Sequence, residues 1–291
     1  MALTFKKPAL LINLSSGSAS DISQDVAARL EEKGHATPEY FVSEGAEISQ
    51  QFEALKSYKP DLIIVFGGDG TCRSAAHIAR EYDIPLIALP GGTMNIFPKE
   101  LYGTIEWEEA LDLALSQTEP RWQRAGMLNN TPFYCGAIIG APTQMATLRE
   151  SVRDGQLSEA VTAIPKVVQS VTEGKTFSYH VDGEQIDFQA NAILLTLPPR
   201  IEGEDYASEI DLASVMPLSV GELLKVGAQS LLMDWRESED IDVKKIQTLE
   251  IEGQGKFEIL LDGEAEIIPA PIHVSQEEKG VRVMAPTAIV P

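Results

Sequence analysis

A glycine-rich segment with one acidic residue, Gly67–Thr71, has the composition of a phosphate-binding loop. It follows the apolar run Leu62–Phe66 and precedes a helical pattern, which is where α/β sheets bind their ligands. Glycines let the backbone approach a phosphate closely, and the N–H groups of the helix's first turn attract its charge. Asp69 would repel phosphates unless a cation lay between them, which favours Mg²⁺ shared with a nucleotide. Thr71 could cap the helix or donate to a phosphate oxygen.

Two other loops of this kind also follow predicted strands. Pro90–Asn95 comes after the apolar run Pro85–Leu89, and Asn13–Gly17 comes after Ala9–Ile12. Because the carboxyl ends of parallel strands meet at one edge of a sheet, loops on neighbouring strands form one crevice. All three loops also have a plainer interpretation as tight strand–helix turns. In Gly67–Thr71, Asp69 would then be a local cap.

The elements that carry these loops alternate short apolar runs with helical spacing. Ile22, Val26 and Leu30 predict a helix over about residues 19–33, with Gly34 at its carboxyl end. A second helical pattern runs from Ile48 toward residue 60, and a third follows the first glycine loop. Strands alternating with helices are typical of βαβ units. Residues 1–125 are therefore predicted to form a Rossmann-like α/β nucleotide-binding domain with a parallel sheet.

After about residue 125 the pattern changes to short alternating strands separated by turn residues. Asp182–Gly183 is a hairpin signal between two alternating segments, and further strands follow up to Val283. The capping-box spacing of Ser219–Glu222 predicts one helix, ending near Trp235. Residues 126–291 are predicted to form an antiparallel β-sandwich domain that binds the substrate, with the final residues packing against the first domain.

Composition and charge exclude several classes of protein. The 291 residues contain 44 Asp and Glu against 23 Lys and Arg, a net charge of −21, and no strongly basic patch. Such a surface repels phosphate backbones, so no nucleic-acid partner is expected. Two cysteines cannot build a disulfide framework and fit a reducing compartment. No apolar stretch is long enough to span a membrane, so we expect a cytoplasmic protein.

A late Asp-Gly-Glu tripeptide, Asp262–Glu264, completes an ordered set of motifs. Taken alone, Asp262–Gly263 is an ordinary hairpin signal, as at Asp182–Glu184. Together with Asn13–Gly17, Gly67–Thr71 and Pro90–Asn95, however, the ordered set resembles the bacterial diacylglycerol kinase and sphingosine kinase-type lipid kinase family. The resemblance spans most of the chain, although about residues 140–215 match only in their general pattern of apolar and polar residues.

Resemblance to this family implies an ATP-binding α/β domain followed by a β-sandwich, with the active site in the cleft between them. It implies transfer of the ATP γ-phosphoryl group to a lipid hydroxyl with Mg²⁺, and transient contact with the inner membrane surface. By position, Glu264 would accept the hydroxyl proton, Asp262 would assist or bind metal, and Asp69 would bind Mg²⁺. The residues that would hold ATP are Asn13, Ser15, Ser16, Gly17, Gly67, Gly68, Asp69, Gly70, Thr71, Gly92, Thr93 and Asn95.

The chain also departs from the family pattern. Arg73 and Ser74 stand where the family usually has Asn and Glu, and Ile96 stands where it often has Asp. Arg73 could instead meet a phosphate or a lipid headgroup. These departures favour, as one alternative, a nucleotide-binding regulatory module that has lost catalysis. The other alternative is an NAD kinase-like enzyme, which shares the Gly-Gly-Asp-Gly loop but fits Pro90–Asn95 less well.

Overall fold

The computed structural model describes residues 3–17, 20–45, 47–93, 95–140, 175–190, 192–197, 209–215, 242–253, 255–262 and 264–287. The helix predicted from Ser219 to about Trp235 lies outside these residues. The chain folds as two compact units. The first comprises Met1–Ala125, Pro199–Tyr206 and Glu278–Pro291, and the second comprises Gly126–Pro198 and Ala207–Glu277.

The first unit is built on a parallel sheet in the order β2-β1-β3-β4. Its strands are β1 (Pro8–Asn13), β2 (Glu39–Ser43), β3 (Leu62–Gly67) and β4 (Leu86–Pro90). The strands β1, β3 and β4 are buried along their whole length, as expected for parallel strands covered on both faces. The end of β16 (Ile272–Val283) joins this sheet, because Val283 pairs in parallel with Leu86.

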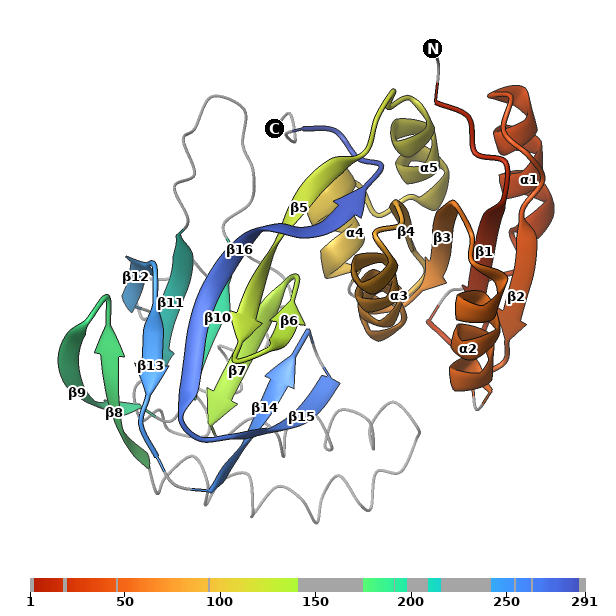
Figure 1. The fold of residues 1–291 in the computed structure, drawn as a ribbon. Helices are drawn as coiled ribbons and strands as arrows, with labels where there is room; N and C mark the ends of the chain where they lie inside the picture. Colours follow the sequence, from red (N-terminus) through yellow and green to blue (C-terminus); the bar gives the residue numbers. More distant parts are fainter. Residues whose placement is uncertain are drawn as a thin grey trace. The chain divides into compact units, whose positions relative to one another are not determined.

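Helices flank this sheet (Figure 1). They are α1 (Ser23–Glu32), α2 (Ile48–Tyr58), α3 (Asp69–Tyr82), α4 (Ile96–Tyr102) and α5 (Trp107–Leu115). Helix α2 contacts β1 and β2, α3 contacts β3 and β4, and α4 and α5 contact β4. Gly34 has a φ of +79° and its N–H donates to Glu31 O, so it ends α1 as predicted.

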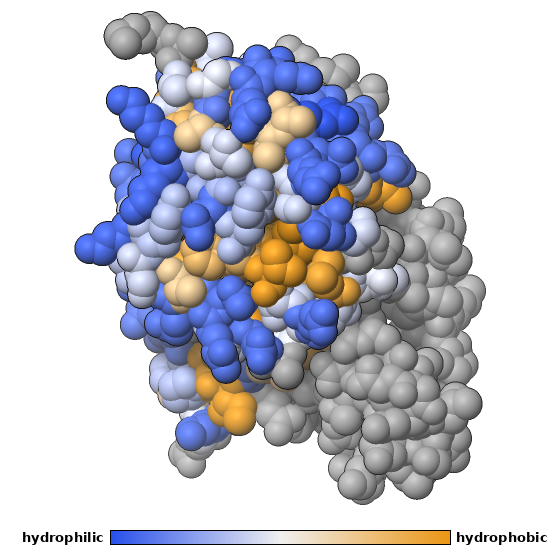
Figure 2. Space-filling view, turned by 90° about the vertical axis from the view of Figure 1, so that its right-hand side faces the viewer, coloured by the Kyte–Doolittle hydropathy of each residue, from blue (hydrophilic) through white to orange (hydrophobic). Residues whose placement is uncertain are grey.

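Strand β2 is the edge strand of this sheet. Its Tyr40 and Val42 lie two residues apart, and they are 41% and 38% exposed. Figure 2 views the side on which α1, β2 and α2 lie, where apolar side chains interrupt a mostly hydrophilic surface. Tyr40 and Val42 are exposed on one face while Phe41 and Ser43 are buried on the other, which explains why β2 lacks the continuous apolar run of β1, β3 and β4.

The second unit contains two antiparallel sheets. One has the order β12-β11-β10-β7-β14-β15, and the other joins β9, β8 and β13 to the beginning of β16, which also pairs with β5. Buried side chains from both sheets form one hydrophobic core, which makes this unit a β-sandwich. The strands are β5 (Arg121–Leu128), β6 (Thr131–Phe133), β7 (Gly136–Gly140), β8 (Lys175–Val181), β9 (Glu184–Ala190), β10 (Ala192–Thr196), β11 (Ile210–Val215), β12 (Asp242–Ile246), β13 (Leu249–Ile251), β14 (Lys256–Leu261) and β15 (Glu264–Pro269).

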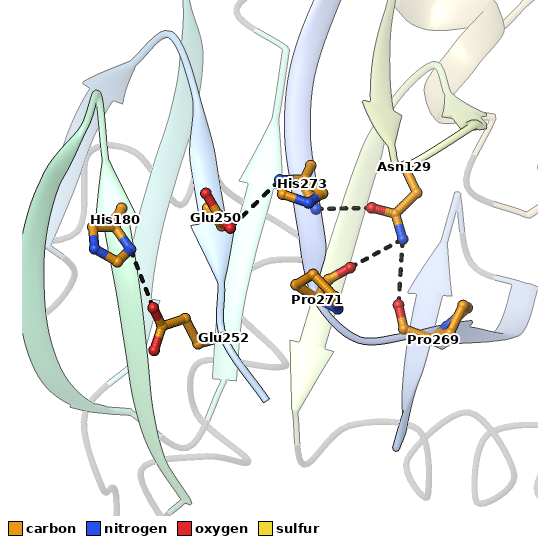
Figure 3. Close-up of polar contacts among 7 residues, drawn as sticks. All are labelled: Asn129, His180, Glu250, Glu252, Pro269, Pro271 and His273. Atoms are coloured by element: carbon orange, nitrogen blue, oxygen red, sulfur yellow. Dashed lines mark hydrogen bonds and ion pairs between the residues drawn. The ribbon is translucent and has the colours of Figure 1, made fainter. Parts of the chain in front are cut away.

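His180 on β8, Glu250 on β13 and His273 on β16 form a row of polar side chains across three neighbouring strands (Figure 3). Glu250 lies directly opposite both His180 and His273, and its carboxylate is 3.8 Å from His273 Nδ1. Beside this row, Asn129 accepts a hydrogen bond from His273 N (2.9 Å) and donates to Pro269 O and Pro271 O (3.3 and 3.2 Å). Asn129 therefore ties the connection between β15 and β16 to the end of β5.

These two architectures confirm the predicted fold class, a Rossmann-like parallel sheet with helices and an antiparallel β-sandwich. Within the described residues, the helices are all too short or too polar to cross a membrane.

Candidate functional site

The three predicted loops lie together at the carboxyl edge of the first unit's sheet, because β1, β3 and β4 are neighbours. Gly91 N donates a hydrogen bond to Gly67 O at 3.0 Å. A Cβ added to Gly17 would lie 3.0 Å from the carbonyl carbon of Gly92, and one added to Gly68 would lie 3.7 Å from Ser16 Oγ. The structure thus brings the three segments into one cradle lined by glycine backbone.

The backbones of the loops Gly67–Thr71 and Pro90–Asn95 touch at one point. A Cβ added to Gly92 would lie 2.5 Å from the Cα of Gly68, and one added to Gly91 would lie 2.9 Å from the N of Gly67. Contacts this short exclude any side chain at either position. The glycines therefore serve first to let the two loops approach each other.

Asn13 connects the loop Asn13–Gly17 to the start of α3 by hydrogen bonds. Its Nδ2 donates to Thr71 Oγ1 (2.9 Å), and its Oδ1 accepts from Ser15 N (3.2 Å) and Ser15 Oγ (2.7 Å). Asn13 and Thr71 are both buried. These two side chains support the cradle from below.

Asn95 stabilises the loop Pro90–Asn95 in a similar way. Its Oδ1 accepts from Gly92 N (2.7 Å) and its Nδ2 donates to Gly92 O (2.9 Å), while its own φ is +51°. The side chain is buried, so it fixes the backbone at Gly92 and Thr93. Thr93 is exposed and can reach a ligand directly.

Asp69 is the first residue of α3, and its carboxylate reaches a different helix. Its Oδ1 accepts a hydrogen bond from Phe97 N (3.1 Å) in the first turn of α4. Asp69 is thus a cap, as the plainer interpretation has it, but of α4. Among the described residues, no group of three or more His, Cys, Asp or Glu side chains is arranged to hold a metal ion. Its role as a Mg²⁺ ligand stays a prediction.

The amino end of α3 supplies hydrogen-bond donors to the cradle. Gly68 is the N-cap residue, and the first intrahelical bond runs from Cys72 N to Gly68 O (3.0 Å). The N–H groups of Asp69, Gly70 and Thr71 precede that bond, so they have no intrahelical acceptor. Together with the helix dipole, such groups attract anions.

The Cys72 thiol is packed beneath the cradle. Its Sγ lies 3.9 Å from Gly67 O and 4.0 Å from Leu89 O. Burial, and secondarily the charge of Asp69, raises the pKa of this thiol well above its usual value. Both cysteines are free and buried, so Cys72 is a structural residue.

The predicted ATP-binding residues therefore divide into two groups. The exposed or half-buried ones can touch a ligand, and they are Ser15, Ser16, Gly17, Gly68, Asp69, Gly70 and Thr93. The buried ones hold the loops in place, and they are Asn13, Gly67, Thr71, Gly92 and Asn95.

Sequence reasoning missed a fourth segment, at the end of β2. Leu14 N donates to Ser43 O (2.8 Å), and Gly45 N donates to Ser43 Oγ (3.1 Å). A Cβ on Gly45 would lie 2.9 Å from Ser15 Oγ. Ser43 and Gly45 thus support the loop Asn13–Gly17. A serine and a glycine directly after a strand were the sequence signal that could have predicted a fourth loop here.

The second unit carries Asp262 and Glu264. Leu261 pairs with Glu264, so Asp262 lies in the connection between β14 and β15, where its local pattern predicts a hairpin. The Asp262 carboxylate is buried and accepts bonds from the backbone N–H groups of Tyr134, Cys135 and Gly136. Glu264 is exposed at the first position of β15. The catalytic roles of both residues stay predictions.

The departures from the family pattern differ in their surroundings. Arg73 is buried on α3, whereas Ser74 is exposed. Ile96 is 40% exposed at the first position of α4.

Comparison with known proteins identifies the domain that carries the cradle. Residues 7–124 match the family model of the diacylglycerol kinase catalytic domain. A glycine cradle at the carboxyl edge of a parallel sheet lies where α/β domains bind their ligands. The match over residues 7–124 is to the family that the motifs resemble, which confirms the resemblance seen in the sequence.

Solved structures show the same fold over nearly the whole chain. A diacylglycerol kinase of Bacillus anthracis str. Sterne is 17% identical, with a TM-score of 0.66, and the match covers 98% of this chain and 99% of that one. A second chain from the same organism has a TM-score of 0.70 and 20% identity, with the same coverage.

Curated relatives match over a shorter stretch. The ATP-dependent 6-phosphofructokinase 2 of Bacteroides thetaiotaomicron is 32% identical over 84 residues, which are 28% of this chain and 24% of that protein. The ATP-dependent 6-phosphofructokinase of Actinobacillus pleuropneumoniae is 33% identical over 92 residues, 30% of this chain and 28% of that protein. The chain thus spans about a quarter of the length of these relatives.

Proposed function

We propose that this protein is an ATP-dependent kinase that transfers the γ-phosphoryl group to the hydroxyl of a diacylglycerol- or sphingoid-like lipid. The observation that carries the proposal is the glycine cradle at the amino end of α3, in a domain that matches the diacylglycerol kinase catalytic family. The ATP-dependent phosphofructokinases among its relatives support ATP as the phosphoryl donor.

The residues of the cradle fit a chain of phosphates. A Cβ added to Gly68 would have only ordinary contacts, with Ser16 Oγ at 3.7 Å and Gly92 Cα at 3.8 Å. Space for a side chain is therefore present, yet glycine keeps it open between the loops. Backbone N–H groups at the start of α3 and the hydroxyl of Ser16 border this space, and the exposed Thr93 follows Gly92 directly.

The chain's own residues would divide the work as follows. Ser16, Gly68 and Gly70 bind phosphate oxygens, and Asn13 and Asn95 keep the loops rigid so that binding needs no rearrangement. Asp69 would hold Mg²⁺, and this ion would supply neutralisation of the phosphates' charge. Glu264 accepts the proton of the lipid hydroxyl as that oxygen attacks. A lipid acceptor also requires transient contact with a membrane surface.

The test is transfer of radioactive γ-phosphate from ATP with Mg²⁺ to four acceptors: vesicles containing diacylglycerol, vesicles containing sphingosine, NAD, and fructose 6-phosphate. We expect label in a lipid. Asp69→Asn and Glu264→Gln should each lower the rate at least about 100-fold. Glu184→Gln is the matched control, because Glu184 follows the other Asp-Gly turn and should be neutral.

Three outcomes would contradict the proposal. Label in NAD or the sugar phosphate alone would refute the lipid acceptor. Tight ATP binding without transfer to any acceptor would identify a regulatory module that has lost catalysis. Full turnover in both Asp69→Asn and Glu264→Gln would remove the assignment of these two carboxylates.

A further inference from the structure

Backbone N–H groups donate hydrogen bonds to both oxygens of the Asp262 carboxylate. Its Oδ1 accepts from Cys135 N (2.8 Å) and Gly136 N (3.0 Å). Tyr134 N donates to both oxygens, at 2.9 Å to Oδ2 and 3.2 Å to Oδ1. Its own N–H donates to Gly136 O (2.8 Å). The residue is 9% exposed. Three successive N–H groups converging on one anion form a nest of backbone dipoles that neutralises its charge.

The chain contains a second copy of this arrangement, at Asp182. Its Oδ1 accepts from Gln247 N (2.9 Å) and Thr248 N (2.8 Å), and its own N–H donates to Thr248 O (3.2 Å). Asp182 and Asp262 each follow the last paired residue of a strand and have a φ of +50°. In both copies an Asp-Gly-Glu hairpin is thus fastened to a neighbouring connection between strands.

The two copies differ in one respect that matters for function. Asp182 is exposed and uses a single carboxylate oxygen, whereas Asp262 is buried and uses both. A general base must reach the proton it removes, and the Asp262 oxygens are already directed at backbone donors. Glu264, two residues further on, is exposed at the beginning of β15.

We infer that Asp262 is a positioning residue: it anchors the β14–β15 turn to Tyr134–Gly136 and so fixes the strand start that presents Glu264. Its effect on turnover rests on the proposed function, in which Glu264 is the proton acceptor, whereas the anchoring of the turn is independent of that function. This assignment is an alternative to the sequence-based expectation that Asp262 assists chemically or binds metal.

The experiment compares Asp262→Asn with Asp182→Asn in the full chain. An Asn at position 262 would turn its NH₂ group toward Tyr134 N, a donor, because both oxygens are used there. An Asn at position 182 keeps its single acceptor oxygen. We therefore expect Asp262→Asn to speed amide hydrogen exchange at Tyr134, Cys135 and Gly136 by about 10-fold or more. Asp182→Asn should change exchange at its partners less than about 3-fold.

Turnover separates positioning from chemistry. In Asp262→Asn we expect kcat to fall about 10-fold, with an unchanged KM for ATP and an unshifted acid limb of the pH–rate profile, since Glu264 still accepts the proton. Glu264→Gln should remove turnover and leave exchange at Tyr134–Gly136 unchanged. An abolished acid limb in Asp262→Asn, with unchanged exchange, would overturn the inference.

Two further results keep the anchor and the proposed function separable. Should Asp262→Asn not fold, the wild-type protein still tests the anchor: unprotected amides at Tyr134–Gly136 would refute it, and slow exchange there would support it. Full turnover in Glu264→Gln would refute the proposed proton acceptor, and therefore the turnover role of Asp262, while the exchange data still decide whether the turn is anchored.

Discussion

Alanine substitutions at Gly92 and Gly68 separate two roles of glycine in the cradle. At Gly92 the new Cβ would lie 2.5 Å from Gly68 Cα and 3.3 Å from Asn95 Oδ1, so it meets backbone that cannot rotate away. Overpacking of this kind costs about 1–3 kcal/mol of folding free energy. At Gly68 the nearest atoms are 3.7 and 3.8 Å away, and its φ of −78° and ψ of 175° suit alanine.

Gly68→Ala should therefore leave the fold nearly unchanged. Gly68 is the N-cap of α3, where alanine is less favourable than glycine, so we expect a loss of less than about 1 kcal/mol. Its methyl group, however, would stand between the loops, in the space that we assign to phosphates. A clash of about 1–3 kcal/mol in the complex corresponds to roughly 5- to 150-fold weaker ATP binding.

The assay pairs urea unfolding with calorimetric titration of ATP in Mg²⁺ buffer for both variants. Gly92→Ala should lose both stability and binding, whereas Gly68→Ala should lose binding alone. Wild-type affinity in Gly68→Ala would refute the placement of phosphates between Ser16 and Gly92. Wild-type stability in Gly92→Ala would refute the direct contact between the two loop backbones.

Three further outcomes follow from individual side chains. Asn95→Ala should cost about 2–4 kcal/mol in urea unfolding, because it removes two buried hydrogen bonds to Gly92 and places alanine at positive φ. Burial lowers the pKa of His35, whose Nδ1 accepts from Phe5 N, so stability is complete above the unfolded-state value near pH 6.5 and falls as the pH drops below it. His35→Asn keeps an acceptor but does not titrate, and unfolding measured from pH 7.5 to 5 should show a smaller loss. Cys72 should resist a thiol reagent at pH 8 until urea unfolds the chain, and rapid labelling of the native protein would contradict its raised pKa.

Buried strands and glycine loops were readable from the sequence because each rests on local residue types. Leu62–Phe66 is apolar throughout, and Gly67–Thr71 follows it directly. Helix α4 was missed because Pro98 suggests a break, yet proline is tolerated in the first turn of a helix. Helix α5 could have been found from the i, i+3, i+4 and i+7 spacing of Trp107, Ala110, Leu111 and Ala114.

The supporting contacts could not be read from the sequence, because they join residues far apart in the chain. The bond from Phe97 N to Asp69 depends on how α4 leaves β4, and the donors to Asp262 are backbone N–H groups with no residue signature. Sequence patterns therefore located the residues of the cradle, while only tertiary structure distinguishes those that can touch ligand from those, such as Asn13, that hold others in place.

Strand β16 determines when the sheet of the first unit can be completed during synthesis of the chain. Leu86 in β4 is paired by Val283 and receives a bond from Met284 N, and Arg121 donates to Pro286 O. Residues 1–125 leave the ribosome long before these partners do, so the outer edge of β4 stays open during most of synthesis. Cutting the chain after Ala125 to isolate the α/β domain should accordingly yield an aggregation-prone fragment, and splicing residues 278–287 onto it should restore solubility.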